Sequence, residues 1–343
     1  FSLPSVTAGT YCLLLSTNNN TDTTAGTPAG WLAIEGSGGK LISVTSTPVN
    51  GQNFGLFNGS RIDGNVFSDL GTGGGTANDG IRNGSEAGIA GVGVKANNGG
   101  TVYDSTTTNG SGDYILWIPA AAGALTITET NLTSYISTGG SIGTAPSGIY
   151  DRTTDTVSFT PVAGTSYTGI NFADVPENRF QTDNTASAMP GTVIFYPHTF
   201  TAGSGGGVVF SATSSASPAI SGWSEIFFLD NDCSGTFSAV DTQIVGAAST
   251  TVVANQSLCI LVKEFVPANA PIGGTNLATL TATFTFTNAP NPALTRSYTR
   301  TDMTTVGTPT GSGLKLAKSV DFFFYVTGYN VIYTITDSNG SSG

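Results

Sequence analysis

Apolar and polar residues alternate along many short segments of this chain. Clear examples are "LATLTATFTFT" (277–287), "LCILVKEFV" (258–266) and "NVIYTIT" (330–336), which are rich in β-branched and aromatic residues. A period of two places successive side chains on opposite faces, so each segment predicts a strand with one buried face. No segment of about twelve residues combines a helical period with capping residues. The pattern therefore predicts an all-β fold of tandem immunoglobulin-like or prealbumin-like β-sandwich modules.

An internal repeat organises the first half of the chain. "YILWIPAAAGALTITET" (114–130) and "FSLPSVTAGTYCLLLST" (1–17) share an aromatic residue, a short apolar run with proline, an Ala-Gly turn and a strand. About forty residues later each is followed by a closing strand, "GINFADV" (169–175) and "GQNFGLF" (51–57), and both contain Gly-x-Asn-Phe. Recurrence on this scale indicates one structural unit that is present twice, with the opening half missing from the first copy.

The complete copy resembles a known family of bacterial surface modules. The resemblance lies in "GNVFSD" (64–69), "GSE" (84–86) at the end of an acidic loop, "GIAGVGV" (88–94) and "TNGSGDY" (108–114). These segments are similar to the B-type repeats of Gram-positive serine-aspartate adhesins and related collagen-adhesin stalk modules. The resemblance covers residues 61–175 and, as a half copy, residues 1–60. It implies a secreted chain whose acidic loop binds calcium and whose modules form a stiff stalk.

The acidic loop of the complete copy is "GTANDGIRNGSE" (75–86). The resemblance implies that calcium is held there by Asp79, the Ile81 carbonyl, Asn83 and Glu86. Asp69, the first ligand of the family pattern, is separated from the loop by the insertion "GTGGGT" (71–76), with Asn78 as a possible substitute ligand. The alternative is a polar, glycine-rich turn that binds no ion.

A second acidic loop, "LDNDCSGTFSAVD" (229–241), has the spacing of an EF-hand calcium loop. Counted from Asp230, its oxygen ligands would occupy loop positions 1, 3, 5, 7, 9 and 12, and Gly235 at position 6 permits the sharp turn. Without helices on either side, such a loop would be a rigid staple and not a switch. The alternative is an Asx-rich hairpin turn without a bound ion. The expected ligands are Asp230, Asp232, Ser234, the Thr236 carbonyl, Ser238 and Asp241.

The three cysteines are too few and too widely spaced for a zinc site. Cys233, inside the second loop, and Cys259, in the strand "SLCILV", are expected to form a disulfide in an oxidising compartment. Two reduced core cysteines are the alternative. Cys12 lies in an apolar strand and is expected to be buried and inert.

The second half of the chain departs from the repeat. Residues 61–176 form the complete B-type module, and residues 177–313 are interpreted as a different β-sandwich that carries the Asp230 loop. Residues 314–343 contain "LKLAKSVD" and "GYNVIYTITDSNGSSG". These two segments resemble the opening of a repeat family of unassigned function in secreted bacterial surface proteins.

On this interpretation the chain begins with the closing half of one module and ends with the opening strands of another. Either the missing halves belong to a longer polypeptide, or a neighbouring identical subunit supplies strands by β-augmentation. The apolar segments "FFFYVTG" (322–328) and "NVIYTIT" are the candidates for donated strands.

Composition narrows the range of functions. A net charge of −11 with 10% charged residues argues against nucleic acid as a partner, and no apolar run reaches the length of a membrane span. His198 is the single histidine and no nucleophile motif accompanies it, so we expect no enzyme. The sequence predicts a structural subunit of a secreted extracellular filament or surface stalk that associates with identical subunits. The alternative is an adhesin that binds a host protein or glycan through Trp31, Trp117 and Trp223.

Overall fold

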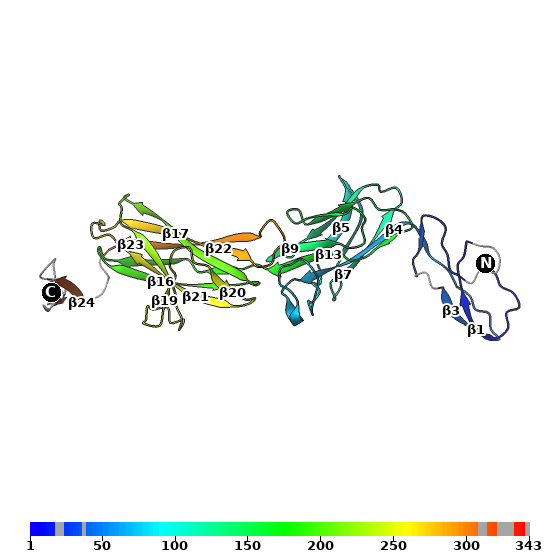
Figure 1. Ribbon diagram of the computed structural model, residues 1–343, viewed down its shortest axis with the longest axis horizontal. Helices are drawn as coiled ribbons and strands as arrows, with labels where there is room; N and C mark the ends of the chain where they lie inside the picture. The colour runs from blue at the N-terminus through cyan, green and yellow to red at the C-terminus, as the bar shows by residue number, and fades with distance from the viewer. Residues whose placement is uncertain (18–23, 36–38, 308–313, 321–332, 340–343) are drawn as a thin grey trace.

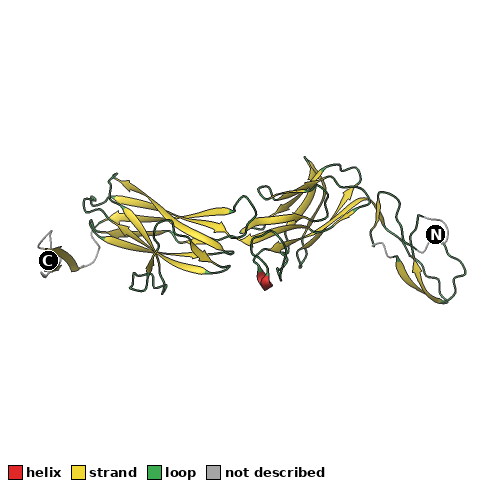
Figure 2. Ribbon diagram, in the orientation of Figure 1, coloured by secondary structure: helices red, strands yellow, loops and turns green. Residues whose placement is uncertain are grey.

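A computed structural model describes residues 1–17, 24–35, 39–307, 314–320 and 333–339, with side chains up to residue 307. The prediction of an all-β fold is confirmed, because strands make up the regular structure apart from one short 3₁₀ turn at Thr72–Gly74 (Figure 2). Within these ranges, no helix has the length and apolar character that crossing a membrane requires. Two β-sandwiches lie end to end along the longest axis of the molecule (Figure 1).

The N-terminal part of the chain is joined to the first sandwich by one continuous strand. β1 (Gly9–Leu13) and β3 (Lys40–Val44) form a two-stranded antiparallel ribbon. β2 (Trp31–Ala33) pairs with the first residues of β4 (Leu56–Ser68), and the rest of β4 enters the sandwich. The boundary that the sequence places after residue 60 therefore falls inside β4.

The first sandwich is built from two sheets around one apolar core. The five-stranded sheet has the order β10 (Ile149–Asp151), β11 (Thr156–Phe159), β8 (Leu125–Thr130), β5 (Gly93–Asn98) and β6 (Thr101–Thr107). The six-stranded sheet has the order β12 (Ser166–Tyr167), β4, β13 (Ile170–Pro176) and β9 (Tyr135–Ile142), and β2 and β7 (Asp113–Pro119) also pair with β4. The core between the two sheets contains large, fully buried side chains, which include Ile62, Leu116, Ile127, Tyr167 and Phe172.

The second sandwich has five strands in each sheet. One sheet has the order β14 (Arg179–Gln181), β16 (Val193–Thr201), β21 (Ser257–Phe265), β18 (Ser224–Leu229) and β19 (Thr242–Gln243). The other has the order β15 (Asn184–Ala188), β23 (Thr295–Val306), β22 (Thr275–Phe286), β17 (Gly206–Ser217) and β20 (Thr250–Val252).

Strand β22 shows why the period-two pattern predicted this sandwich. Its alternating residues Ala278, Leu280, Ala282, Phe284 and Phe286 all point into the core, and the threonines between them face outward. Further along the chain, β24 (Leu314–Val320) pairs with β25 (Tyr333–Asn339) in an antiparallel hairpin. The segment "FFFYVTG" lies outside the described residues.

Buried ionisable groups interrupt the core of the second sandwich. His198 is buried, and its Nε2 lies 3.0 Å from the Asp302 carboxylate. Glu264 on β21 is 0% exposed, and the described salt bridges leave it without a basic partner. Burial raises the pKa of Glu264 from 4.5 to about 7. The folded protein therefore binds this proton more tightly than the unfolded chain does.

We predict that this proton makes the stability of the second sandwich depend on pH. Because the pKa of Glu264 is raised in the folded protein, the stabilising contribution of its proton is complete below the unfolded pKa of 4.5. This contribution is lost as the pH rises through the folded pKa of about 7. Wild type should therefore lose roughly 2–3 kcal/mol of unfolding free energy between pH 4.5 and 8 that Glu264→Gln does not lose. Urea unfolding at several pH values measures this, with the exposed Glu177→Gln as control. Parallel pH profiles of wild type and Glu264→Gln would refute it.

Candidate functional site

The acidic loop 230–241 extends from the end of strand β18 on the second sandwich. Its start is fixed to the sheet, because the Asp230 amide donates to the Cys259 carbonyl at 2.9 Å and continues the β18–β21 pairing. Asp230 is buried, Asp241 is half-buried and Asp232 is exposed. Carboxylate oxygens of these three residues lie within 4.8 Å of one another. The structure thus brings together the three acids that the loop spacing selected.

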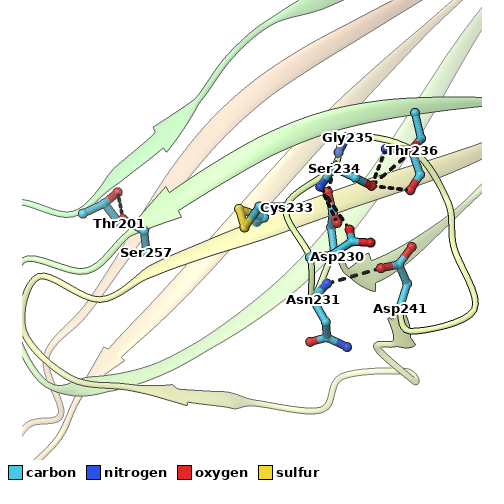
Figure 3. Close-up of a disulfide and its surroundings, with 11 residues drawn as sticks. Thr201, Asp230, Asn231, Cys233, Ser234, Gly235, Thr236, Asp241 and Ser257 are labelled. Carbon is cyan, nitrogen blue, oxygen red and sulfur yellow. Dashed lines mark hydrogen bonds between the residues drawn. A yellow bond between two sulfur atoms is a disulfide. The ribbon is translucent and has the colours of Figure 1, made fainter.

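Backbone amides orient all three carboxylates. Asp232 accepts from the Ser234 amide at 3.1 Å, and Figure 3 shows amides that donate to Asp230 and Asp241. Asp230 accepts from the Ser234 and Gly235 amides at 3.1 and 2.8 Å, and Asp241 accepts from Ser238 at 2.7 Å. Gly235 adopts a φ of 69°, which glycine reaches without strain. The amide donors therefore hold these carboxylates in fixed orientations within the loop.

The remaining predicted ligands take part in hydrogen bonds within the same loop. The Ser234 hydroxyl donates to the Thr236 carbonyl at 2.9 Å, and the Ser238 hydroxyl donates to Asp232 at 3.3 Å. Hydrogen bonds, above all from Ser234, lower the pKa of Asp232. Carboxylate, hydroxyl and carbonyl oxygens are the hard ligands that calcium prefers.

A disulfide fastens the loop to the neighbouring strand. Cys233 and Cys259 are bonded, with 5.4 Å between their Cα atoms, as the sequence predicted. The expectation for Cys12 was wrong, because this residue is exposed and not buried. Its strand β1 belongs to the two-stranded ribbon and not to a sandwich core, so apolar neighbours in the sequence did not indicate burial.

The first acidic loop is organised differently. Asp69 is fully buried and accepts from the Gly80 amide and the Thr138 hydroxyl, and burial raises its pKa to about 6. Glu86 accepts from the Gly71 and Asn83 amides, and Asp79 accepts from the Ile81 amide and the Asn83 side chain. The carboxylates of Asp69, Asp79 and Glu86 do not form one of the close groups of three found among the described residues. Calcium in this loop stays a prediction.

Asn78 has a structural role that the sequence did not reveal. It is fully buried where the two sandwiches meet. Its Nδ2 donates to the Gly205 carbonyl at 3.0 Å and the Thr287 carbonyl at 3.1 Å, and its Oδ1 accepts from the Ser204 hydroxyl at 2.6 Å. The amide is fully engaged across the junction, which corrects the suggestion that Asn78 substitutes as a calcium ligand.

Further contacts close the junction around Asn78. Arg152 of the first sandwich donates to the Pro290 carbonyl at 2.9 Å and also contacts the Pro292 carbonyl. Ile136 and Val175, which belong to strands of the first sandwich, pack within the apolar core of the second. The backbones approach so closely that a Cβ on Gly203 would lie 1.8 Å from the Pro176 carbonyl oxygen. The two sandwiches are therefore packed as one continuous body at this end.

A third acidic group was missed by sequence analysis. Glu129, Asp155 and Asp174 are all buried in the first sandwich, and their carboxylate oxygens lie within 4.8 Å of one another. Burial, reinforced by the neighbouring acids, raises the pKa of Glu129 and Asp174. The three residues come from separate segments, so no spacing motif marks them. The available signal was an acid at an inward position of an alternating strand, as Glu129 is in "LTITET".

The tryptophans form no exposed aromatic patch. Trp31, Trp117 and Trp223 are half-buried. Trp117 packs edge-on against Phe57 with 5.2 Å between ring centroids, and Trp223 packs against a small core that includes Val266. Both contacts are packing contacts, so they provide no support for the adhesin alternative.

No protein-family model matches this chain, and no curated protein sequence matches it. Solved structures with a similar strand arrangement include three pilin subunits. BcpA, the major pilin subunit of Bacillus cereus, is 12% identical with a TM-score of 0.37, covering 82% of this chain and 83% of that chain. The major pilin SpaD of Corynebacterium diphtheriae is 12% identical with a TM-score of 0.25, covering 80% and 70%. The minor pilin GBS52 of Streptococcus agalactiae is 10% identical with a TM-score of 0.26, covering 74% and 99%.

Likenesses at these identities and TM-scores are too weak to carry a function to this chain. The resemblance of residues 1–175 to B-type repeats stays a prediction. So does the resemblance of residues 314–343 to a second surface repeat.

We predict that the Asn78 amide determines the stiffness of the junction. Asn78→Gly removes its three hydrogen bonds, while glycine adopts the native φ of 63° without strain. We expect a loss of about 1–3 kcal/mol in unfolding free energy, because buried partners lose their hydrogen bonds. We also expect a broader distribution of inter-module angles in small-angle X-ray scattering.

Asn288→Gly is the matched control for this experiment. Asn288 has a similar φ of 59° but is exposed and makes one hydrogen bond across the junction, to the Ala77 carbonyl. Its replacement should change both measurements much less. Equal effects of the two substitutions would show that the Asn78 amide has no special role.

Proposed function

We propose that this chain is a structural subunit of an extracellular filament or surface stalk, built from β-sandwich modules held end to end. The observation that carries the proposal is the closed junction, in which a buried amide, an arginine and a shared apolar core join the two sandwiches. Inter-domain interfaces within a chain normally permit relative motion unless they are large and apolar. A junction of this kind transmits bending and tension instead of absorbing them, which is what a stalk requires.

The second sandwich contributes features of the same kind. The disulfide joins the 230–241 loop to strand β21. A force applied at that loop is therefore transmitted to the sheet through a covalent bond. His198 is buried and paired with Asp302, so the single histidine of the sequence is engaged in the core. These features favour a mechanical role over a catalytic one.

We further propose that the Asp230 loop is a calcium staple. Its acids are already held in place by backbone amides, so a bound ion would neutralise repulsion without rearranging the loop. Asp241 in place of glutamate at position 12 has a shorter reach, which predicts weaker binding than in a full EF-hand.

We predict that calcium stabilises the second sandwich through this loop. At a free calcium concentration about a hundredfold above the dissociation constant, the gain is about 2.7 kcal/mol. Asp232→Asn should abolish this part of the gain, because it removes one exposed carboxylate of the cluster. Thermal melting with chelator and with calcium measures the difference, and Glu225→Gln, an acid outside the loop, is the control. A calcium-dependent gain of equal size in wild type and Asp232→Asn would rule the staple out.

Assembly by strand exchange is the second finer proposal. β1 and β3 form a sheet of two strands, and an isolated pair of strands is marginally stable in water. A groove of about 710 Å³ lies along this ribbon. Its apolar lining includes Leu3, Val6, Tyr11, Leu13, Ile42 and Val44. We propose that a strand from residues 320–343 of a second copy pairs with the ribbon, which would propagate into a fibre because the contact is head-to-tail.

We predict that deleting residues 320–343 abolishes polymerisation of the purified chain and leaves both sandwiches folded. Electron microscopy and light scattering measure polymerisation, and circular dichroism measures folding. The control is deletion of residues 340–343, which removes "GSSG" and leaves strand β25 in place. Filaments formed by the longer deletion would refute strand exchange. A full chain that stays monomeric at high concentration would also refute it.

A further inference from the structure

The acids Glu129, Asp155 and Asp174, here called the buried triad, meet between the two sheets of the first sandwich. Glu129 comes from β8, Asp174 from β13, and Asp155 from the turn between β10 and β11. A β-bulge between Ala173 and Asp174 shifts the register of β13 at this point. Exposed fractions of 4%, 8% and 1% show that water has almost no access to the three side chains.

Donors available to the triad do not satisfy it. Asp155 accepts from the Tyr150 hydroxyl at 3.0 Å and from the Ser137 hydroxyl at 2.7 Å. Glu129 Oε1 and Asp174 Oδ2, by contrast, are buried without any hydrogen-bond partner. None of the described salt bridges involves the triad. Buried carboxylates without partners are strongly unfavourable unless a positive charge or protons compensate them.

The side chain of Asn131 lies next to the triad. Its amide nitrogen is within donating distance of Glu129 Oε2, at 2.5 Å, and of Asp155 Oδ2, at 3.2 Å. This donor still leaves Glu129 Oε1 and Asp174 Oδ2 without a partner. Turning over the same amide would present its oxygen to an ion bound among the carboxylates.

We propose that the buried triad, with Asn131, forms a calcium site that is separate from the Asp230 loop. The ligands are all hard oxygens, which select calcium or magnesium over transition metals. The ligand oxygens lie within 4.8 Å of one another, no further apart than two calcium–oxygen distances of about 2.4 Å, so one ion can contact all three residues. Magnesium usually keeps several of its water ligands, so it suits a site with almost no access to water less well.

Such an ion would fasten the turn that reaches the next module. Asp155 follows Arg152 by three positions in the β10–β11 turn, and Arg152 donates to the Pro290 carbonyl of the second sandwich. On the opposite strand, Asp174 adjoins Val175, which packs in the second sandwich's core. Calcium would therefore hold together two segments that support the junction.

Terbium(III), a luminescent substitute for calcium, tests the site in the full chain. The Tyr150 hydroxyl is bonded to a triad carboxylate, so terbium bound there should emit when tyrosine is excited. The aromatic residues packed around the Asp230 loop are phenylalanines, which sensitise terbium poorly at that wavelength. We expect emission from wild type and from Asp232→Asn, and loss of most of it from Tyr150→Phe. Isothermal titration should show that Tyr150→Phe still binds calcium.

The double variant Glu129→Gln with Asp174→Asn should lose one equivalent of calcium relative to wild type and lose the terbium emission. Asp151→Asn, which removes an exposed acid at the end of β10, is the matched control and should bind as wild type does. If the double variant fails to fold, Asp232→Asn and Tyr150→Phe still decide the matter, because both leave the triad intact. Asp232→Asn protein that binds no calcium and gives no emission would overturn the site and show that protons alone neutralise the triad. Loss of one equivalent of calcium in Asp232→Asn with the terbium emission retained concerns the Asp230 loop alone, so the two sites are judged separately.

Discussion

Hydrogen bonds of one buried side-chain amide, that of Asn78, fix the orientation of the two sandwiches relative to each other. The connection between the sandwiches is very short, because β13 ends at Pro176 and β14 begins at Arg179. A short connection limits separation but leaves bending and twisting free. Asn78 removes that freedom, because its donors and acceptor are engaged by Ser204, Gly205 and Thr287 of the next module, away from water. Any rotation of one sandwich against the other would break these bonds without replacing them.

Polar groups of the two linker residues reinforce this constraint. The Glu177 amide donates to the Ser134 carbonyl at 2.8 Å, and the Gly203 amide donates to Asn178 Oδ1 at 2.7 Å. Both linker residues thus have assigned partners, one in each module. The apolar contacts of Ile136 and Val175 with the second core then contribute the non-directional part of the attraction. The polar contacts fix the relative orientation of the two sandwiches, and the apolar contacts contribute to the attraction between them.

Sequence reasoning predicted the features that depend on short stretches of chain. Alternation along β22 identified a strand and its buried face, and the spacing from Asp230 to Asp241 identified a loop whose acids do converge. The Cys233–Cys259 bridge followed from few cysteines and a strand next to the loop. The sequence predicted a module boundary after residue 60, but β4 runs through this position. The sequence gives no sign of this, because a strand that serves two modules has the same alternating pattern as any other strand.

Features formed by segments that are far apart in the sequence could not be predicted from local sequence patterns. Asn78 looked like a loop ligand because its partners lie more than a hundred positions away, in a module whose placement no local pattern encodes. The same holds for Cys12, whose apolar neighbours suggested a core that β1 does not join. Glu129, Asp155 and Asp174 each look unremarkable alone, and they form a group only because two strands and a turn bring them together.

The acidic residues of this protein lie in different environments in the two acidic loops and in the buried triad. In the Asp230 loop, amide donors fix the orientation of the carboxylates. In the Asp69 loop, the same kind of donor is used to close a turn, and the Asp69 amide in turn donates to the Asp174 carbonyl. That last bond links the turn to the buried triad, and Asn78 follows in the same loop. The loop next to the junction is thus connected by hydrogen bonds to the triad on one side and to the second sandwich on the other. An ion held by the triad would consequently act on the junction through bonds that already exist.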